Sequence, residues 1–266
     1  MGEAMVRGAL NANVLRPDQV RVADPSQERR DLLQSRYQVR VSASNRNVLA
    51  GAEVVVLAVK PEHAGGVLSE LRGALRPGQL VLSVVAGLPL AALVAGLGHG
   101  AVVRAIPNTP AQVGAGVSAW MACPEVDAGG RSSAAALLGA LGQAHEVDDE
   151  DYLDMATALS GSGPAYVFLF LEALIDAGVH VGLPRSIARL LATETLLGAA
   201  TMARDGEMHP AQLRNMVTSP GGTTAAGLAE LEAGGLRAAV DQAVVSAYNR
   251  SVELGRGRPP REEERR

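Results

Sequence analysis

The sequence predicts an α/β domain followed by an all-α domain, and two observations carry this prediction. In the first half, short β-branched runs alternate with stretches of helical apolar spacing, the pattern of strand–helix–strand units. In the second half the strand signals vanish and helical periodicity continues. The composition changes at the acidic stretch 148–151, so we expect one domain at residues 1–150 and a second at 151–254.

The first half is expected to form a mainly parallel sheet. Strands are predicted at 20–23, 39–41, 54–59, 80–85, 101–106 and 116–122, with helices at 25–35, 61–75 and 133–141. The run at 54–59 is apolar at every position rather than at alternate ones, which fits a parallel strand covered on both faces.

The second half is expected to be helical throughout. Helices are predicted at 154–181, 184–205, 210–218, 224–232 and 236–254. Pro184 and Pro210 stand where helices should begin, and Gly182 and Gly206 stand just past helix ends. Residues 255–266 are rich in Arg, Glu and Pro and have no aliphatic side chain, so a disordered tail is expected there.

Composition excludes several classes of function. The net charge of −4 and the scattered arginines argue against a nucleic-acid-binding surface. We expect no membrane span, because no apolar run reaches the roughly 18 residues that a span requires, and we expect no leader peptide at the start of the chain. The expected location is the cytoplasm.

The composition also limits which metal-dependent and lysine-dependent mechanisms are possible. Cys123 is the single cysteine, and the five histidines show no HxxxH or HxE spacing, so no metal site is expected. Lys60 is the only lysine, so a mechanism that needs a Schiff-base or proton-donating lysine must use that position.

Two glycine-rich segments interrupt the helical half. These are Ser-Gly-Ser-Gly-Pro-Ala-Tyr at 160–166 and Thr-Ser-Pro-Gly-Gly-Thr-Thr at 218–224. Gly and Pro inside a helix cost about 1 and 3 kcal/mol, so dense clusters flanked by hydroxyls indicate backbone N–H groups and side-chain donors offered to an anion. The alternative is a pair of ordinary interhelical loops.

The first residues look like the end of a dinucleotide-binding fingerprint. Met1 and Gly2 open a helix, as the last glycine of that motif does, but the preceding strand and two earlier glycines are absent. Asp24 ends the next predicted strand, about 20 residues on, where an acidic residue binds the ribose. An ordinary amphipathic N-terminal helix is the alternative.

Four segments, taken in order, give the chain a close resemblance to the pyrroline-5-carboxylate reductases, which complete proline biosynthesis. They are Ala-Val-Lys-Pro at 58–61, Val-Arg-Ala-Ile-Pro-Asn-Thr-Pro-Ala at 103–111, 159–168 and 217–224. The resemblance implies a Rossmann-type N-terminal domain, with its first strand truncated here, and an all-α C-terminal dimerisation domain. Members typically begin with a strand ending in Gly-x-Gly-x-Met-Gly, so we expect a misassigned start codon or, failing that, a degraded cofactor site.

The implied reaction is reduction of the cyclic imine 1-pyrroline-5-carboxylate to L-proline by hydride from NADPH or NADH. A protonated imine is already electrophilic, so the enzyme has chiefly to align the reactants and supply a hydrogen bond near the ring nitrogen. The resemblance implies catalytic roles for Thr224, whose hydroxyl contacts that nitrogen, and for Glu207, in a proton-supply network. A solvated helix-end charge is the alternative for Glu207.

The resemblance also implies the binding residues. The substrate carboxylate is expected at the backbone N–H groups of Gly222 and Thr223, at a helix N-terminus whose dipole favours an anion. The implied substrate-binding set is Ser162, Gly221, Gly222, Thr223 and Thr224. The implied cofactor-binding set is Met1, Gly2, Asp24, Asn45, Ala58, Val59, Lys60, Pro61, Asn108, Thr109 and Ser160. Turn formation is the alternative for both asparagines.

The preference between the two cofactors is left open by the sequence. Asp24 would bind a ribose 2′-hydroxyl and repel a 2′-phosphate, whereas Arg29 and Arg30 could neutralise that phosphate. We therefore expect both NADPH and NADH to be accepted.

Self-association follows from the apolar helices. The segments 167–171 and 190–192 have few polar positions, and a helix apolar around most of its circumference must be buried on several sides. The resemblance implies a homodimer with interleaved helical domains, or a decamer of such dimers, in which the segment 218–224 of one chain completes the site of the other.

Two other functions are compatible with parts of the sequence. A β-hydroxyacid dehydrogenase has a similar domain order but uses a catalytic lysine in its helical half, whereas Lys60 lies in the first half. A cofactor-impaired homologue acting as a binding or scaffold protein is the alternative from another class.

Overall fold

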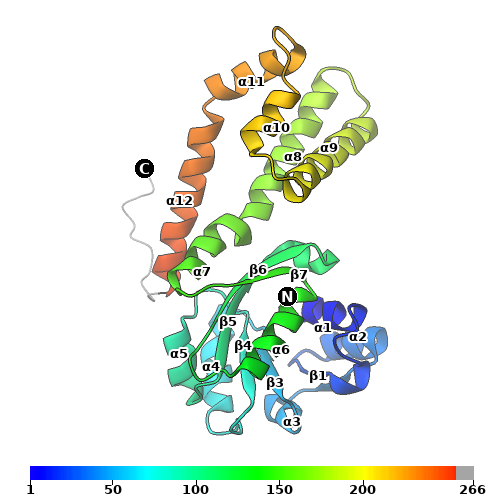
Figure 1. Cartoon of the computed structure of the whole chain (residues 1–266). Coiled ribbons are helices and arrows are strands. Elements are labelled where there is room, and N and C mark those ends of the chain that lie inside the picture. The colour runs from blue at the N-terminus through cyan, green and yellow to red at the C-terminus, as the bar shows by residue number, and fades with distance from the viewer. Residues whose placement is uncertain (256–266) are drawn as a thin grey trace. The chain divides into compact units, whose positions relative to one another are not determined.

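The computed structural model describes residues 1–255 and divides into two compact units (Figure 1). The first unit comprises Met1–Ser162 together with the chain from Ala247 onward, and the second comprises Gly163–Ser246. The tail expected at 255–266 lies outside the described residues, except for Gly255, which ends the last helix.

The first unit is an α/β domain. Its strands are β1 (Arg21–Ala23), β2 (Arg40–Ser42), β3 (Val54–Leu57), β4 (Leu80–Ser83), β5 (Val102–Pro107), β6 (Gly116–Ala122) and β7 (Gly142–Glu146). Its helices are α1 (Gly2–Asn11), α2 (Gln27–Tyr37), α3 (Asn45–Leu49), α4 (Pro61–Leu71), α5 (Leu90–Leu97), α6 (Ala128–Gly139) and α7 (Asp151–Ala156), with the 3₁₀ turns η1 (Pro17–Gln19) and η2 (Thr109–Val113) and the π-helical turn η3 (Thr157–Gly161).

Five strands form one sheet in the order β3-β4-β5-β6-β7. All neighbours are parallel except β5 and β6, where Arg104 is opposite Met121 in an antiparallel register. Helices α4 and α5 lie on one side of this sheet and α1 and α6 on the other (Figure 1). The core centres on β4 and β5, whose apolar side chains are almost fully buried. This is a Rossmann-like arrangement.

The other two strands form a separate parallel pair, β1-β2, with Val22 opposite Val41. Within residues 1–255, neither β1 nor β3 pairs with a strand on its second edge. The strand expected at 54–59 is present and parallel to β4, but it ends at Leu57, and Val56 is 37% exposed, so the two faces are not both covered.

Several elements were missed by the sequence patterns. Strand β7 follows the helix expected at 133–141. It is an edge strand, and Gln143, His145 and Glu146 are exposed, so the strand has no apolar run. Helix α5 is short and apolar at nearly every position, which conceals its period. The antiparallel pairing of β5 with β6 was also not anticipated.

The second unit is helical. It contains α8 (Gly163–His180), α9 (Arg185–Asp205), α10 (Pro210–Met216), α11 (Thr223–Ala233) and most of α12 (Leu236–Gly255). Many of its large apolar side chains are exposed, including Val167, Phe168, Leu169, Leu190 and Leu197. A helical unit with this surface requires further apolar surface to cover it.

The boundary between the units differs from the one expected after residue 150. Helix α7, η3 and the last turns of α12 belong to the α/β unit. The physical reason is local: Leu153 is fully buried, and Asp154 accepts hydrogen bonds from Arg104 in β5 and Ser251 in α12. The helical periodicity at 154–181 gave no sign of this division.

One helix passes a test of length and composition for a membrane span. The continuous helical stretch Asp151–His180 is long and apolar enough to cross a membrane, by length and composition only, so the expectation that no apolar run reaches this length is wrong by that measure. A helix buried inside an assembly of helices passes the same test, and the exposed apolar side chains of α8 fit that explanation.

Candidate functional site

Helix α1 begins against the end of β3. A Cβ atom on Gly2 would lie 3.4 Å from the Cβ of Ala58, so the first turn of the helix packs closely on the strand end. Met1 is the N-cap residue and provides no side-chain hydrogen bond. The first amides of α1 therefore keep the capacity to bind an anion, as the pyrophosphate of a dinucleotide requires.

Asp24 lies directly after β1 and shapes the turn into α2. Its Oδ1 accepts a hydrogen bond of 2.9 Å from the Ser26 amide, and Ser26 in turn caps α2 by accepting from the Arg29 amide. The Arg30 guanidinium donates to the backbone oxygen atoms of Asp24 and Pro25. Arg30 therefore stabilises the turn through backbone acceptors.

Arg29 is held by Glu3 of α1. Its Nη2 lies 2.8 Å from Glu3 Oε2, while Glu3 Oε1 accepts from the Tyr37 hydroxyl at 3.0 Å. The Arg29 hydrogen bond lowers the pKa of Glu3, against partial burial and with a smaller contribution from Tyr37. Burial, then the hydrogen bond to Glu3, raises the pKa of Tyr37. Both arginines expected near a 2′-phosphate thus already have protein acceptors.

The segment 58–61 joins β3 to α4. Lys60 is the N-cap of α4 and Pro61 its first residue, a position where the missing proline N–H costs nothing. The Lys60 side chain is 77% exposed, and its Nζ lies 3.9 Å from Glu62 Oε1. Ala58 and Val59 are half-buried. The backbone of this segment, rather than the Lys60 ammonium, borders the strand end near Gly2.

Asn45 begins α3, and its Nδ2 donates to Glu70 Oε2 in α4 at 2.7 Å. Its amide nitrogen thus has a protein partner. In the first unit, the structure connects Asn45 to α4 and not to any other expected cofactor-binding residue.

Asn108 and Ser160 come together although they are far apart in the sequence. Asn108 is buried at the end of β5, its Nδ2 donates to the Ser160 backbone oxygen at 3.1 Å, and its Oδ1 accepts from the Val117 amide at 3.0 Å. The Ser160 hydroxyl donates to the Ala156 oxygen. Thr109 is exposed at the start of η2. Asn108 therefore links two strands to the first glycine-rich segment.

That segment is helical rather than a loop: its first two residues end the π-helical turn η3, and Gly163 begins α8. The Ser162 amide donates to the Thr157 oxygen at 2.9 Å, five residues earlier, which is the spacing of a π-helix. Single π turns inside α-helices are frequent at functional sites. The break in helical pattern thus marks a widened turn that carries Ser160 and Ser162.

The second glycine-rich segment, in the helical unit, forms the N-terminus of α11. Gly221 has a φ of +70°, and a Cβ on Gly222 would lie 2.5 Å from Ser219 Oγ, so both positions favour glycine. The Gly222 amide already donates to the Ser219 oxygen at 3.1 Å. Among the described residues, the amides of Thr223, Thr224 and Ala225 have no backbone acceptor. The amides available to an anion thus begin at Thr223, one residue later than the expected Gly222.

Thr224 is half-buried in the first turn of α11. Glu207 is exposed between α9 and α10, just before the N-cap residue His209, which accepts from the Ala211 amide through Nδ1. Within residues 1–255, no hydrogen bond joins Glu207 to Thr224. The structure places the two expected catalytic residues in one unit without linking them.

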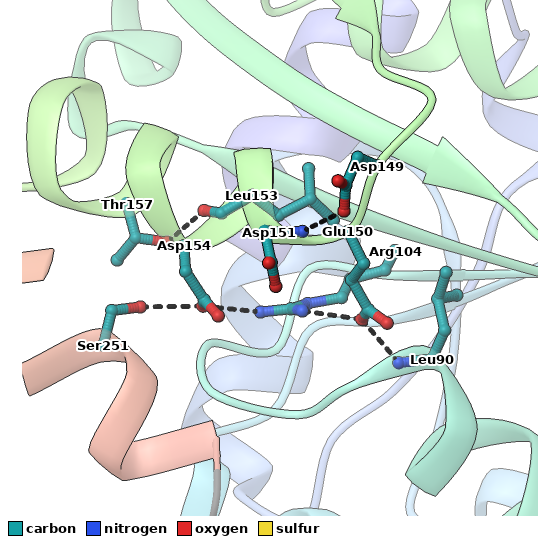
Figure 2. Close-up of polar contacts among 9 residues, drawn as sticks. All are labelled: Leu90, Arg104, Asp149, Glu150, Asp151, Leu153, Asp154, Thr157 and Ser251. Atoms are coloured by element: carbon teal, nitrogen blue, oxygen red, sulfur yellow. Dashed lines mark hydrogen bonds and ion pairs between the residues drawn. The ribbon is translucent and has the colours of Figure 1, made fainter. Parts of the chain in front are cut away.

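A buried polar cluster was not predicted from the sequence. Arg104, in the middle of β5, is only 2% exposed, and its guanidinium contacts Glu150 and Asp154, while Ser251 also contacts Asp154 (Figure 2). An arginine inside the apolar run 102–106 was the available signal, because a buried charge needs partners.

Neither of two open hollows in the structure coincides with the expected site. Two open hollows of about 490 and 920 Å³ are lined by residues outside the expected site sets. In the part of the chain that is described, no three His, Cys, Asp or Glu side chains group as metal ligands, and burial raises the pKa of the Cys123 thiol.

The chain matches two family models. Residues 150–254 match the model described as pyrroline-5-carboxylate reductase dimerisation, and residues 1–87 match the one described as NADP oxidoreductase, coenzyme F420-dependent.

Curated relatives extend the match to nearly the whole chain. A pyrroline-5-carboxylate reductase of Synechocystis is 47% identical over 96% of this chain and 95% of its own length. The reductase of Pseudomonas aeruginosa is 44% identical over 94% of this chain and 92% of its own length. The protein of the same name from Pisum sativum is 43% identical over 96% of this chain and 92% of its own length.

Solved structures agree. The reductase of Coxiella burnetii superposes with a TM-score of 0.89 at 39% identity, covering 95% of this chain and 94% of that one. The Plasmodium falciparum pyrroline carboxylate reductase, solved with NADP bound, gives 0.87 at 33% identity, covering 96% and 94%. A prephenate dehydrogenase of Aquifex aeolicus, at 13% identity and 0.52, shares the fold alone.

Proposed function

The chain belongs to the pyrroline-5-carboxylate reductase family and is an NAD(P)H-dependent oxidoreductase; we propose how its residues divide the reduction of 1-pyrroline-5-carboxylate to L-proline. The observation that carries the family is the 47% identity to a named reductase over 96% of the chain. The reaction adds a hydride to the imine carbon while the C=N electrons become the amine lone pair. In reverse it oxidises a CH–NH bond, which is the enzyme class we assign.

The residues present fit a nicotinamide dinucleotide in part. NAD(P)H supplies the hydride when bound. We assign the pyrophosphate to the open N-terminus of α1 at Gly2, the ribose to the turn after Asp24, and the nicotinamide side to the ends of β3 and β5. The close packing of Gly2 on Ala58 and the position of Asp24 after β1 support these assignments.

The substrate carboxylate is assigned to the N-terminus of α11. Three successive free amides and the helix dipole favour an anion there, and the glycines before them let the chain approach closely. Thr224 is assigned the hydrogen bond to the ring nitrogen, because its hydroxyl lies in the same first turn as those amides. Glu207 stays a proposed member of the proton-supply network.

The active assembly is proposed to be a homodimer or a larger set of dimers, a decamer being the larger alternative. The match of residues 150–254 to a dimerisation family and the exposed apolar side chains of α8 and α9 support self-association. A cytoplasmic location stays a prediction. The comparisons give no support to the scaffold alternative.

The test is a coupled measurement of nicotinamide oxidation and proline formation. The chain is assayed as it stands and with an N-terminal extension that encodes a strand ending in Gly-x-Gly-x, with each of NADPH and NADH. We expect the extended protein to reduce 1-pyrroline-5-carboxylate with both cofactors. A folded, extended protein that oxidises neither cofactor would refute the assignment and revive the scaffold alternative.

A further inference from the structure

We propose that Arg104 is a positioning residue for the reductase reaction: through Glu150 and Asp154 it holds the π-helical turn η3, and so Ser160 and Ser162, at the end of β5. The proposal rests on the proposed function, in which these serines lie beside the nicotinamide and the substrate. It assigns a role to a buried cluster whose residues belong to neither the expected cofactor-binding set nor the expected substrate-binding set.

Arg104 is fixed by its two terminal nitrogens. Nη1 lies 2.7 Å from Glu150 Oε1 and Nη2 lies 3.3 Å from Asp154 Oδ1, whereas within residues 1–255 its Nε has no acceptor. A buried guanidinium is costly unless its partners are in place. The orientation of Arg104 and the position of its two carboxylate partners therefore determine each other.

The two carboxylates lie on one face of the helix that leads to the turn. Glu150 is the N-cap residue of α7 and Asp154 follows four residues later, a spacing that places both on the same side. Arg104 thus contacts α7 along one face. Loss of either contact would weaken the hold of β5 on the orientation of α7.

Two further elements support the same carboxylates. Glu150 Oε1 also accepts from the Leu90 amide at the start of α5, at 2.7 Å, and Asp154 Oδ1 accepts from the buried Ser251 hydroxyl of α12, at 2.9 Å (Figure 2). Strand β5 and helices α5 and α12 therefore all meet α7 through this cluster.

Strand β5 holds the segment a second time beyond α7. Asn108, four residues after Arg104 in the chain, donates to the backbone oxygen of Ser160. The stretch from Asp154 to Ser160 is therefore attached at both ends to β5 or the residue that follows it, and the second attachment lies within the π turn. If the Arg104 contacts are weakened, Ser160 keeps its hydrogen bond from Asn108, but the orientation of α7, and with it that of the two serines, is less well defined.

A small displacement matters for this reaction because the enzyme chiefly aligns two reactants. A misplacement of about 1 Å can cost on the order of a hundredfold in rate. If the cluster only stabilised the fold, its removal would lower the stability of the protein but leave the π turn and the kinetics of the folded protein unchanged.

The test uses Asp154→Asn and the milder Ser251→Ala in the full-length chain, with Arg104→Lys as the conservative partner of Arg104→Met. The control is Glu146→Gln, which removes the exposed Arg131–Glu146 pair between α6 and β7. The readouts are kcat and KM for each substrate, and hydrogen exchange of the Ser162 amide, which reports the π-turn bond to Thr157.

We expect Asp154→Asn to lower kcat about tenfold, and Ser251→Ala to lower it less. The KM for the nicotinamide cofactor should change less than about twofold, because the adenosine side is bound elsewhere. Arg104→Lys should recover part of the activity that Arg104→Met loses. Exchange at Ser162 should accelerate in Asp154→Asn and Ser251→Ala and stay unchanged in Glu146→Gln.

Unchanged kcat and unchanged Ser162 exchange in folded Asp154→Asn and Ser251→Ala would overturn the proposal, as would an equal loss in Glu146→Gln. If Arg104→Met does not fold, the Ser251→Ala and Asp154→Asn results decide. An unsubstituted protein that stays inactive with the N-terminal extension would count against the proposed function, whereas the exchange measurement would still decide whether the cluster sets the turn.

Discussion

Asn108 and Ser160, 52 positions apart, are joined by a hydrogen bond of 3.1 Å from the Asn108 side-chain amide to the Ser160 backbone oxygen. The other side of the same amide accepts from the Val117 backbone at 3.0 Å. Asn108 is thus a structural link between β5, β6 and the π turn. Its expected contact with the cofactor stays a prediction.

Asn108→Ala should destabilise the protein, because it removes the side-chain partner of the Val117 amide and of the Ser160 carbonyl at a buried position. The expected loss is about 1–3 kcal/mol in the free energy of unfolding, measured by urea denaturation. Asn45→Ala is the matched control, since it removes one hydrogen bond to Glu70 at a half-buried position. Equal losses in the two variants would show that the Asn108 link carries no special weight.

Thr224→Ala should reduce catalysis far more than stability. A lost hydrogen bond to a polarised group costs about 1.5–3 kcal/mol in the transition state, which is roughly a tenfold to hundredfold loss in kcat/KM. Ser219→Ala in the preceding turn should have a smaller effect. A change below about threefold would indicate that water or another donor serves the ring nitrogen.

The Glu3–Arg29 pair should give the stability a pH dependence. The pKa of Glu3 is lowered in the folded state, so its contribution is present above its unfolded value and is lost as pH falls through the folded value. Glu3→Gln should therefore cost about 1 kcal/mol or less near neutral pH, and the difference should vanish in acid.

Urea midpoints measured for both proteins at several pH values provide the check. Glu232→Gln is a useful comparison, because Glu232 also has a lowered pKa from an arginine, Arg237, but is fully exposed. A Glu3→Gln difference that grows toward acid pH would contradict the sign of the shift.

Mixed dimers should restore activity if two chains build each site. Subunits carrying Thr224→Ala are mixed with subunits defective at Lys60 and Pro61, and some sites then combine an intact α11 with an intact β3 end. We expect activity above that of either parent after subunit exchange. No recovery despite proven exchange, or an active monomer in sedimentation, would show that each chain builds its site alone.

Most of the strands and the helices of the second unit could be predicted from the sequence, because apolar period and the placement of Gly and Pro act locally. The misses have particular causes. Strand β7 is a polar edge with Gln143 and His145 exposed, so it shows no strand pattern. The boundary at Ser162 depends on Leu153 and Asp154 packing on the sheet, and helical period does not change there.

The sequence by itself determined the local chemistry of the site: the glycines and threonines at 218–224 encode a helix N-terminus through backbone preferences that need no distant partner. Tertiary structure alone decided which side chains meet. Arg104 contacts Asp154 across 50 positions, and Asp154 contacts Ser251 across 97. Such contacts depend on how strands and helices pack, and no local pattern records a partner that only folding brings within hydrogen-bond distance.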